Sequence, residues 1–163
     1  MKRSIVVALF AILSTASAFA QEKNPLSPIL TAYLGIKDAL VTGDANLASS
    51  HASEFLLAID AVDMNKLPAK DHSSFMTLKD KLGFDARHIS EMKKLDHQRE
   101  HFATLSNNMY TLAKSARLSS EPVYKDFCPM KKSSWLSMDK DIKNPYYGNA
   151  MLTCGQITET IKP

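Results

Sequence analysis

The stretch KLDHQREHFATLSNNMYTLAKSAR, from Lys94 to Arg117, decides the fold class. Apolar residues recur along it at intervals that place them on one side of a single long helix. They are Leu95, Phe102, Leu105, Met109, Leu112 and Ala116. A helix with one apolar side buries that side against other elements, so the stretch predicts a helical domain.

Three more helices are expected upstream. The first has Ser27 as N-cap and Pro28 at its first position, and Gly43 ends it. The second is capped by Asp44, and the third begins near Asp71. The apolar stripes of these helices are Ile29, Tyr33, Ile36 and Leu40; Ala48, Ala52, Phe55, Ile59 and Val62; and Phe75, Leu78 and Leu82.

The connections between these segments are short, which favours antiparallel neighbours. Gly83 weakens the middle of the third helix and predicts a kink or a split before Ile89. The fold class is therefore mainly α, an antiparallel up-and-down bundle of about four helices.

The C-terminal tail, residues 119–163, has a different pattern. Residues 123–127 and 134–137 read as short strands, residues 144–148 as a turn and residues 151–157 as a third extended piece. Such pieces are too short to form a core of their own, so we expect the tail to pack on the bundle. Its expected anchors are Phe127, Trp135, Tyr146 and Tyr147.

The N-terminus predicts export. Lys2 and Arg3 precede a short apolar run, and Ala18-Phe19-Ala20 is typical of a cleavage site, so residues 1–20 are expected to be a signal peptide cut near Ala20. Residues 21–163 would then form one domain, periplasmic or secreted and not membrane-spanning after cleavage. This part holds 18 basic and 17 acidic residues, since two of the 20 basic residues lie in the leader. That balance argues against nucleic acid as a partner.

Several motifs resemble one family. Cys128-Pro129-Met130 and Trp135-Leu136-Ser137 are followed by Asn144-Pro145-Tyr146-Tyr147-Gly148 and by Met151-Leu152-Thr153-Cys154-Gly155. Upstream, Gln98-Arg99 leads into Phe102, Leu105 and Ser106. Together they resemble a family of small exported bacterial domains of unknown function. Its members also occur fused to periplasmic adaptors of copper and silver efflux pumps. The resemblance implies metal handling, with an efflux adaptor or another periplasmic protein as partner.

Four sulfur atoms in the tail are candidate metal ligands. Cys128, Met130, Met151 and Cys154 supply two thiols and two thioethers, which suit Cu(I) or another soft metal ion. If the strands near residues 128 and 151 pair, the four sulfurs converge. On a continuous strand, however, Met151 and Cys154 would point to opposite faces, so convergence requires a bend before Gly155.

A structural disulfide is the alternative. Two cysteines in the irregular part of an exported protein are the ordinary setting for a Cys128–Cys154 bond. The domain would then be a non-enzymatic protein-interaction module, with the surface from Trp135 to Tyr147 facing a partner. A reducible disulfide that opens to bind Cu(I) would combine both interpretations.

Helix residues 97–101 carry a second candidate metal site. His97 and His101 lie one turn apart and can share Zn²⁺ or Cu²⁺. With Glu100 they match H-x-x-E-H, a signature of zinc peptidases, but the match is short and a solvated helix face is the preferred interpretation. We expect no enzyme activity. Arg99 is expected to be a structural clamp that reaches tail carbonyls or the loop at Asp139–Asp141.

Overall fold

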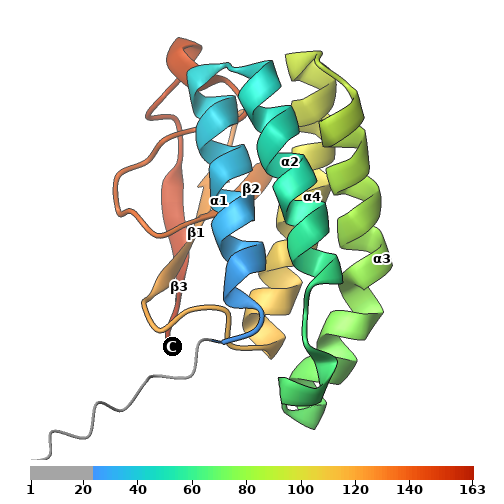
Figure 1. The fold of residues 1–163 in the computed structure, drawn as a ribbon. Coiled ribbons are helices and arrows are strands. Elements are labelled where there is room, and N and C mark those ends of the chain that lie inside the picture. The colour runs from blue at the N-terminus through green and yellow to red at the C-terminus, as the bar shows by residue number, and fades with distance from the viewer. Residues whose placement is uncertain (1–23) are drawn as a thin grey trace, which may run out of the picture.

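Helices α1 to α4 form the bulk of the described part of the molecule (Figure 1). The computed structural model describes residues 24–163, and the expected signal peptide lies outside them. Each helix packs against the next in an up-and-down bundle, so the predicted mainly α fold is confirmed. The helices are α1 (Ser27–Thr42), α2 (Ala45–Asp60), α3 (Ala69–Glu91) and α4 (Leu95–Ser115), with a short 3₁₀ turn η1 (Met64–Lys66) before α3.

The tail forms a small antiparallel sheet on one side of the bundle (Figure 1). Its strands are β1 (Val123–Cys128), β2 (Ser133–Ser137) and β3 (Gln156–Ile161), in the order β2-β1-β3. A 3₁₀ turn η2 (Gly148–Ala150) lies in the long connection from β2 to β3. Strand β2 packs on α4 and η2 packs on α1, so the tail is docked rather than separate.

One hydrophobic core joins the bundle and the sheet. The predicted stripes of the four helices are buried, except that Leu95 is only partly buried. Aromatic side chains make the junction: the rings of Tyr33 and Phe102 stack with centroids 5.2 Å apart, and Tyr146 lies between Phe102 and Trp135. Tail anchors therefore complete the helical core.

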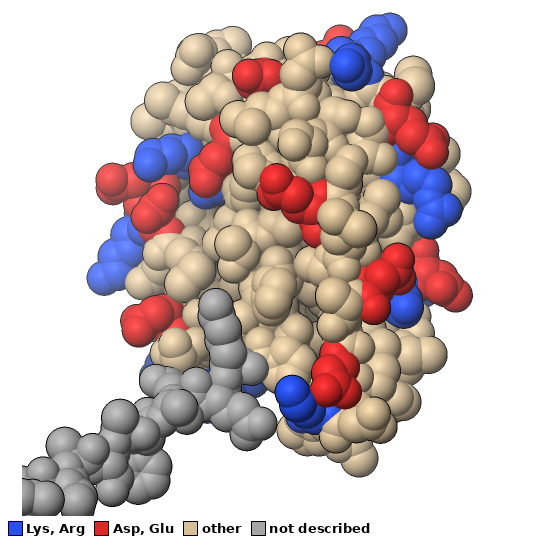
Figure 2. Space-filling view, in the orientation of Figure 1, with Lys and Arg blue, Asp and Glu red and all other residues tan. Residues whose placement is uncertain are grey.

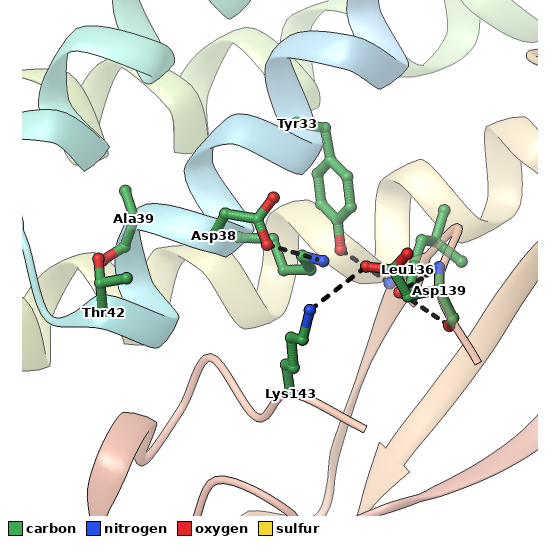
Figure 3. Close-up of polar contacts among 9 residues, drawn as sticks. Tyr33, Asp38, Ala39, Thr42, Leu136, Asp139 and Lys143 are labelled. Atoms are coloured by element: carbon green, nitrogen blue, oxygen red, sulfur yellow. Dashed lines mark hydrogen bonds and ion pairs between the residues drawn. The ribbon is translucent and has the colours of Figure 1, made fainter. Parts of the chain in front are cut away.

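The hydroxyl of Tyr33 is the central polar link between bundle and sheet. It accepts a hydrogen bond from the backbone N–H of Leu136 at 2.9 Å (Figure 3) and shares a second, 2.7 Å bond with the hydroxyl of Ser106. Burial raises the pKa of Tyr33, so the hydroxyl stays protonated. Nearby, the buried Lys37 pairs with the exposed Asp38 at 2.9 Å.

The helix ends follow the sequence signals with one exception. Gly43 ends α1 in the left-handed region (φ 77°), and Asp44 accepts from the N–H groups of Asn46 and Leu47. The exception is Ser27, which is the first residue of α1 and not its N-cap. Its hydroxyl donates instead to the carbonyl of Leu118, because the end of α4 lies beside it.

Of the kink or split predicted at Gly83, the split is wrong. Helix α3 runs unbroken from Ala69 to Glu91. The neighbours Leu82 and Ala86 are fully buried, and their packing keeps the segment helical despite the conformational freedom of glycine. A Cβ at position 83 would meet no atom within 4 Å.

The surface offers no single-sign patch on the face drawn in Figure 2, where acidic and basic side chains alternate around a largely uncharged centre. Within residues 24–163, no helix is long and apolar enough to cross a membrane.

Gly83→Ala should raise the free energy of unfolding by about 0.5–1 kcal/mol, because alanine loses less backbone entropy in a helix and the added methyl group meets nothing. Urea unfolding followed by circular dichroism measures this. Gly43→Ala is the control: its left-handed backbone should make the same substitution destabilising. A loss of stability in Gly83→Ala would contradict the open space described for this position.

Candidate functional site

The two thiols meet at the end of the sheet. Cys128 is the last residue of β1, and Cys154 lies two residues before β3. Phe127 pairs with Gln156 across the two strands, so the next residues outward lie side by side. The two Sγ atoms are 3.6 Å apart, both as free thiols. The structure thus brings together two of the four predicted sulfur ligands.

The two thiols differ in pKa. Burial raises the pKa of Cys128, but hydrogen bonds from the Lys131 N–H, the Asn144 amide, the Cys154 thiol and the Met130 N–H outweigh it, and the net pKa lies below the ordinary value. The pKa of Cys154 is raised, chiefly because its thiol proton bonds to Cys128. Cys128 is therefore the first to become a thiolate, the form that binds metal.

The two methionines border this pair from exposed positions. Met130 lies in the turn after β1, and its backbone N–H is close to both thiols. Its side chain is 63% exposed, and that of Met151 is 37% exposed. The extended piece predicted over residues 151–157 is wrong at its start: Met151 to Cys154 is a turn closed by a 3.0 Å bond from the Cys154 N–H to the Met151 carbonyl.

Asn144 holds that turn in place. It is fully buried, and its amide donates to the Cys154 carbonyl at 2.6 Å while its N–H donates to the Leu152 carbonyl at 2.8 Å. Its side-chain oxygen accepts from the N–H groups of Tyr146 and Tyr147. From the sequence, Asn144 is expected only to be a turn residue. The signal that could have indicated this role is its position: Asn144 precedes Pro145 within the segment that connects the two cysteines.

Gly155 is required by close packing beneath the thiols. A Cβ there would lie 2.8 Å from Cη2 of Trp135 and 3.1 Å from Ile142. Trp135 and Tyr146 are 1% and 4% exposed, so they are anchors beneath the site. These two rings are too buried to touch a partner directly, whereas Phe127 and Tyr147 are partly exposed.

Arg99 links the bundle to the tail. Its Nε donates to the Pro145 carbonyl at 3.0 Å and its Nη2 to the Leu40 carbonyl at 3.1 Å. The first bond is to a tail carbonyl, one of the two partners expected from the sequence. Gly148 lies against the same corner, where a Cβ would be 2.8 Å from the Val41 carbonyl and 3.1 Å from Arg99.

Gln98 performs a similar role inside the bundle. Its Nε2 lies within hydrogen-bond distance of three carbonyls, those of Ala45 (2.9 Å), Ile89 (3.1 Å) and Met92 (2.7 Å). These belong to the start of α2 and the end of α3, so one side chain joins three helices. The sequence motif contained Gln98, but periodicity alone does not show that it is buried.

The predicted histidine pair lies away from the thiols, on α4. The ring centroids of His97 and His101 are 4.7 Å apart, and Nδ1 of His101 is 3.0 Å from the carboxylate of Asp85. In residues 24–163, no three imidazole, thiol or carboxylate groups already converge as a preformed metal site.

Comparison with known proteins places the bundle in a family. The family model described as "Protein of unknown function (DUF3347)" matches residues 29–121, more than half of the chain. The chain belongs to this family. The matched region spans the four helices with Gln98 and Arg99 and ends before β1, so the thiol pair lies outside it. No curated protein and no solved structure matches the chain.

Asp126, on β1, is a buried carboxylic acid near the bundle. It is fully buried, and neither of its oxygens has a hydrogen-bond partner among the described residues. Burial raises its pKa to about 7, against the opposing charge of Lys37. In the unfolded chain the group ionises near its ordinary pKa of about 4. It therefore holds its proton in the fold over the range between these values.

Asp126→Asn should stabilise the protein in a pH-dependent way. The native chain should lose stability as pH rises from about 4 to 7, because the unfolded state ionises first, and the curve should flatten above pH 7. The advantage of the variant should grow over that range by up to about 4 kcal/mol. Denaturant unfolding at half-unit pH steps measures it. The exposed Asp80→Asn is the control, and parallel curves for native and Asp126→Asn proteins would contradict the raised pKa.

Arg99→Lys should lower the free energy of unfolding by about 1.5–3 kcal/mol, because a lysine cannot donate from two rigid positions to the Pro145 and Leu40 carbonyls. The tail should also become more sensitive to limited proteolysis. The exposed Arg87→Lys is the matched control on α3. Equal stability of the two variants would show that the Arg99 clamp is dispensable.

Proposed function

We propose that the domain binds a soft metal ion, Cu(I) in the first place, through Cys128 and Cys154. The observation that carries this proposal is the 3.6 Å separation of the two sulfurs. Two thiolates on one tetrahedral metal ion, with bonds of about 2.3 Å, lie about 3.8 Å apart. The pair thus needs little movement to share an ion, and thiolates are preferred ligands of soft ions.

The surroundings of the pair suit ion exchange. Cys128 is fully buried and becomes a thiolate readily, whereas Cys154 is partly exposed. An ion would bind first to Cys154 and would then be coordinated by both sulfur atoms. The exposed thioethers of Met130 and Met151 are weak ligands on the Cys154 side, where they would receive and release the ion.

This chemistry fits an exported accessory protein without enzyme activity. The predicted signal peptide, the resemblance to domains fused with copper and silver efflux adaptors, and the sulfur pair all support a carrier. It would pass the ion by ligand exchange to an efflux adaptor or another periplasmic protein. The near-neutral charge of residues 21–163 gives no reason to expect nucleic acid as a partner.

The second candidate is a protein-interaction module stapled by a Cys128–Cys154 disulfide. The same closeness of the sulfurs favours it, since a turn of the side chains would bring them to bonding distance. Closing this loop would contribute about 3.5 kcal/mol by the chain-entropy relation. The two candidates differ in the role of the methionines, because a structural disulfide does not involve the exposed thioethers.

Anaerobic Cu(I) titration against a chromophoric competitor should show one ion per chain. Cys128→Ser and Cys154→Ser should each weaken binding by at least about 100-fold, because one thiolate holds Cu(I) poorly. Met130→Ile and Met151→Ile should weaken binding or slow transfer by about 10-fold while helix content stays unchanged.

The exposed Met76→Ile on α3 is the matched control for the methionine variants. If Met130→Ile and Met151→Ile both bind and release Cu(I) as the native chain does, the thioethers have no part in the site. If the cysteine variants bind equally well, the site itself is wrong.

Intact mass of the protein isolated without reductant separates the two candidates. Two free thiols and a stoichiometric copper adduct support the carrier. A mass lower by two hydrogens, unchanged by Cu(I), supports the stapled module, in which Cys128→Ser lowers the melting temperature and Met130→Ile does not.

A further inference from the structure

Three histidines from α3 and α4 form a cluster that shares no residue with the proposed copper site. His88 comes from the last turn of α3, and His97 and His101 lie on successive turns of α4. Their ring centroids are 4.4 Å apart for His88 and His101, 4.7 Å for His97 and His101, and 6.2 Å for His88 and His97. Spacing along the sequence predicts the α4 pair but not His88, which the α3–α4 turn brings beside it.

The ring centres are spaced as one bound ion would require, although in their present rotamers no three ligand groups of residues 24–163 converge on one point. A point equidistant from the three ring centres lies about 3.1 Å from each. An imidazole nitrogen binds Zn²⁺ at 2.0–2.1 Å, which puts the centre of a bound ring about 3.2 Å from the ion. The rings now lie tilted or edge to face, so binding would require them to turn about the Cβ–Cγ bond, a rotation that moves each ring centre little.

A buried carboxylate already orients one of the rings. Asp85 is 3% exposed, and its Oδ1 lies 3.0 Å from Nδ1 of His101. Burial raises the pKa of Asp85, while hydrogen bonds from His101 and Asn108 oppose the rise. A carboxylate on one ring nitrogen leaves the other nitrogen for a metal, which is the arrangement found behind most metal-bound histidines.

Hydrogen bonds of Gln98 connect the two helices that carry the three rings. Gln98, next to His97, donates to the carbonyls of Ile89 and Met92, which follow His88 at the end of α3. A pocket of about 630 Å³ adjoins His101 and is also lined by Asp85 and Glu100.

We propose that His88, His97 and His101 bind a divalent transition-metal ion, Zn²⁺ or Cu²⁺, with Asp85 as the positioning residue for His101. Imidazole suits these ions, whereas the thiol pair suits Cu(I), so the domain would carry two sites of different ligand chemistry.

The test uses Zn²⁺ and the full mature chain. In long-range ¹H–¹⁵N spectra of the native protein, Zn²⁺ should shift the ring signals of His88, His97 and His101 and leave those of His51 and His72 unchanged. In a Cys128→Ser/Cys154→Ser background, which removes the thiol site, a chromophoric competitor should report one Zn²⁺ per chain. His88→Ala, His97→Ala and His101→Ala should each weaken binding at least 10-fold.

Asp85→Asn should weaken Zn²⁺ binding about 10-fold and change the tautomer of His101 in the same spectra, an effect that a purely structural role would not produce. The exposed His72→Ala is the control and should bind as its parent does. The proposal is overturned if His88→Ala keeps full affinity, because the ion would then be held by the α4 pair alone. It is also overturned if Zn²⁺ shifts none of the three ring signals in the native chain.

Discussion

Carbonyl groups at the helix ends need hydrogen-bond donors, and two adjacent side chains of α4 supply them. A helix leaves its last carbonyls unpaired, and burying them without donors is costly. Arg99 donates to the Leu40 carbonyl at the end of α1 and to the Pro145 carbonyl of the tail. Gln98 donates to carbonyls at the end of α3 and at the start of α2. The same α4 turn thereby sets the positions of α1, α2, α3 and the tail. Both residues fall within the region matched by the family model.

The thiol pair is a consequence of this docking. Arg99 fixes the chain at Pro145, Asn144 fixes the turn before Gly155, and the β1–β3 register then places Cys154 beside Cys128. Each step fixes a backbone group, so the site depends on the path of the chain more than on the cysteines themselves. The pKa difference between the two thiols follows from the same path, because Cys128 accepts from the Lys131 N–H and the Asn144 amide and Cys154 does not.

Periodicity predicted the bundle well because each helix has one continuous apolar stripe and clear end signals, such as Gly43 and Asp44. It failed at Gly83, where tertiary packing outweighs a local preference. It failed again at Met151, because no local rule shows that a buried Asn144 captures carbonyls eight and ten residues downstream. For the sites, residue type identified the sulfurs and the α4 histidines. The meeting of Cys128 with Cys154, and of His88 with His101, depends on register and helix packing, which spacing along one chain does not encode.

The hydroxyl of Tyr33 bonds to a backbone group 103 residues further along the chain. The bundle, in contrast, is built from neighbouring helices, so its loops close at low entropic cost. We therefore expect the helices to assemble first and the sheet to condense on them afterwards. During that interval the two cysteines are separate and solvent-accessible, and they become partners only when β3 joins β1. The reactivity of the thiols toward an alkylating reagent would then report the last stage of folding.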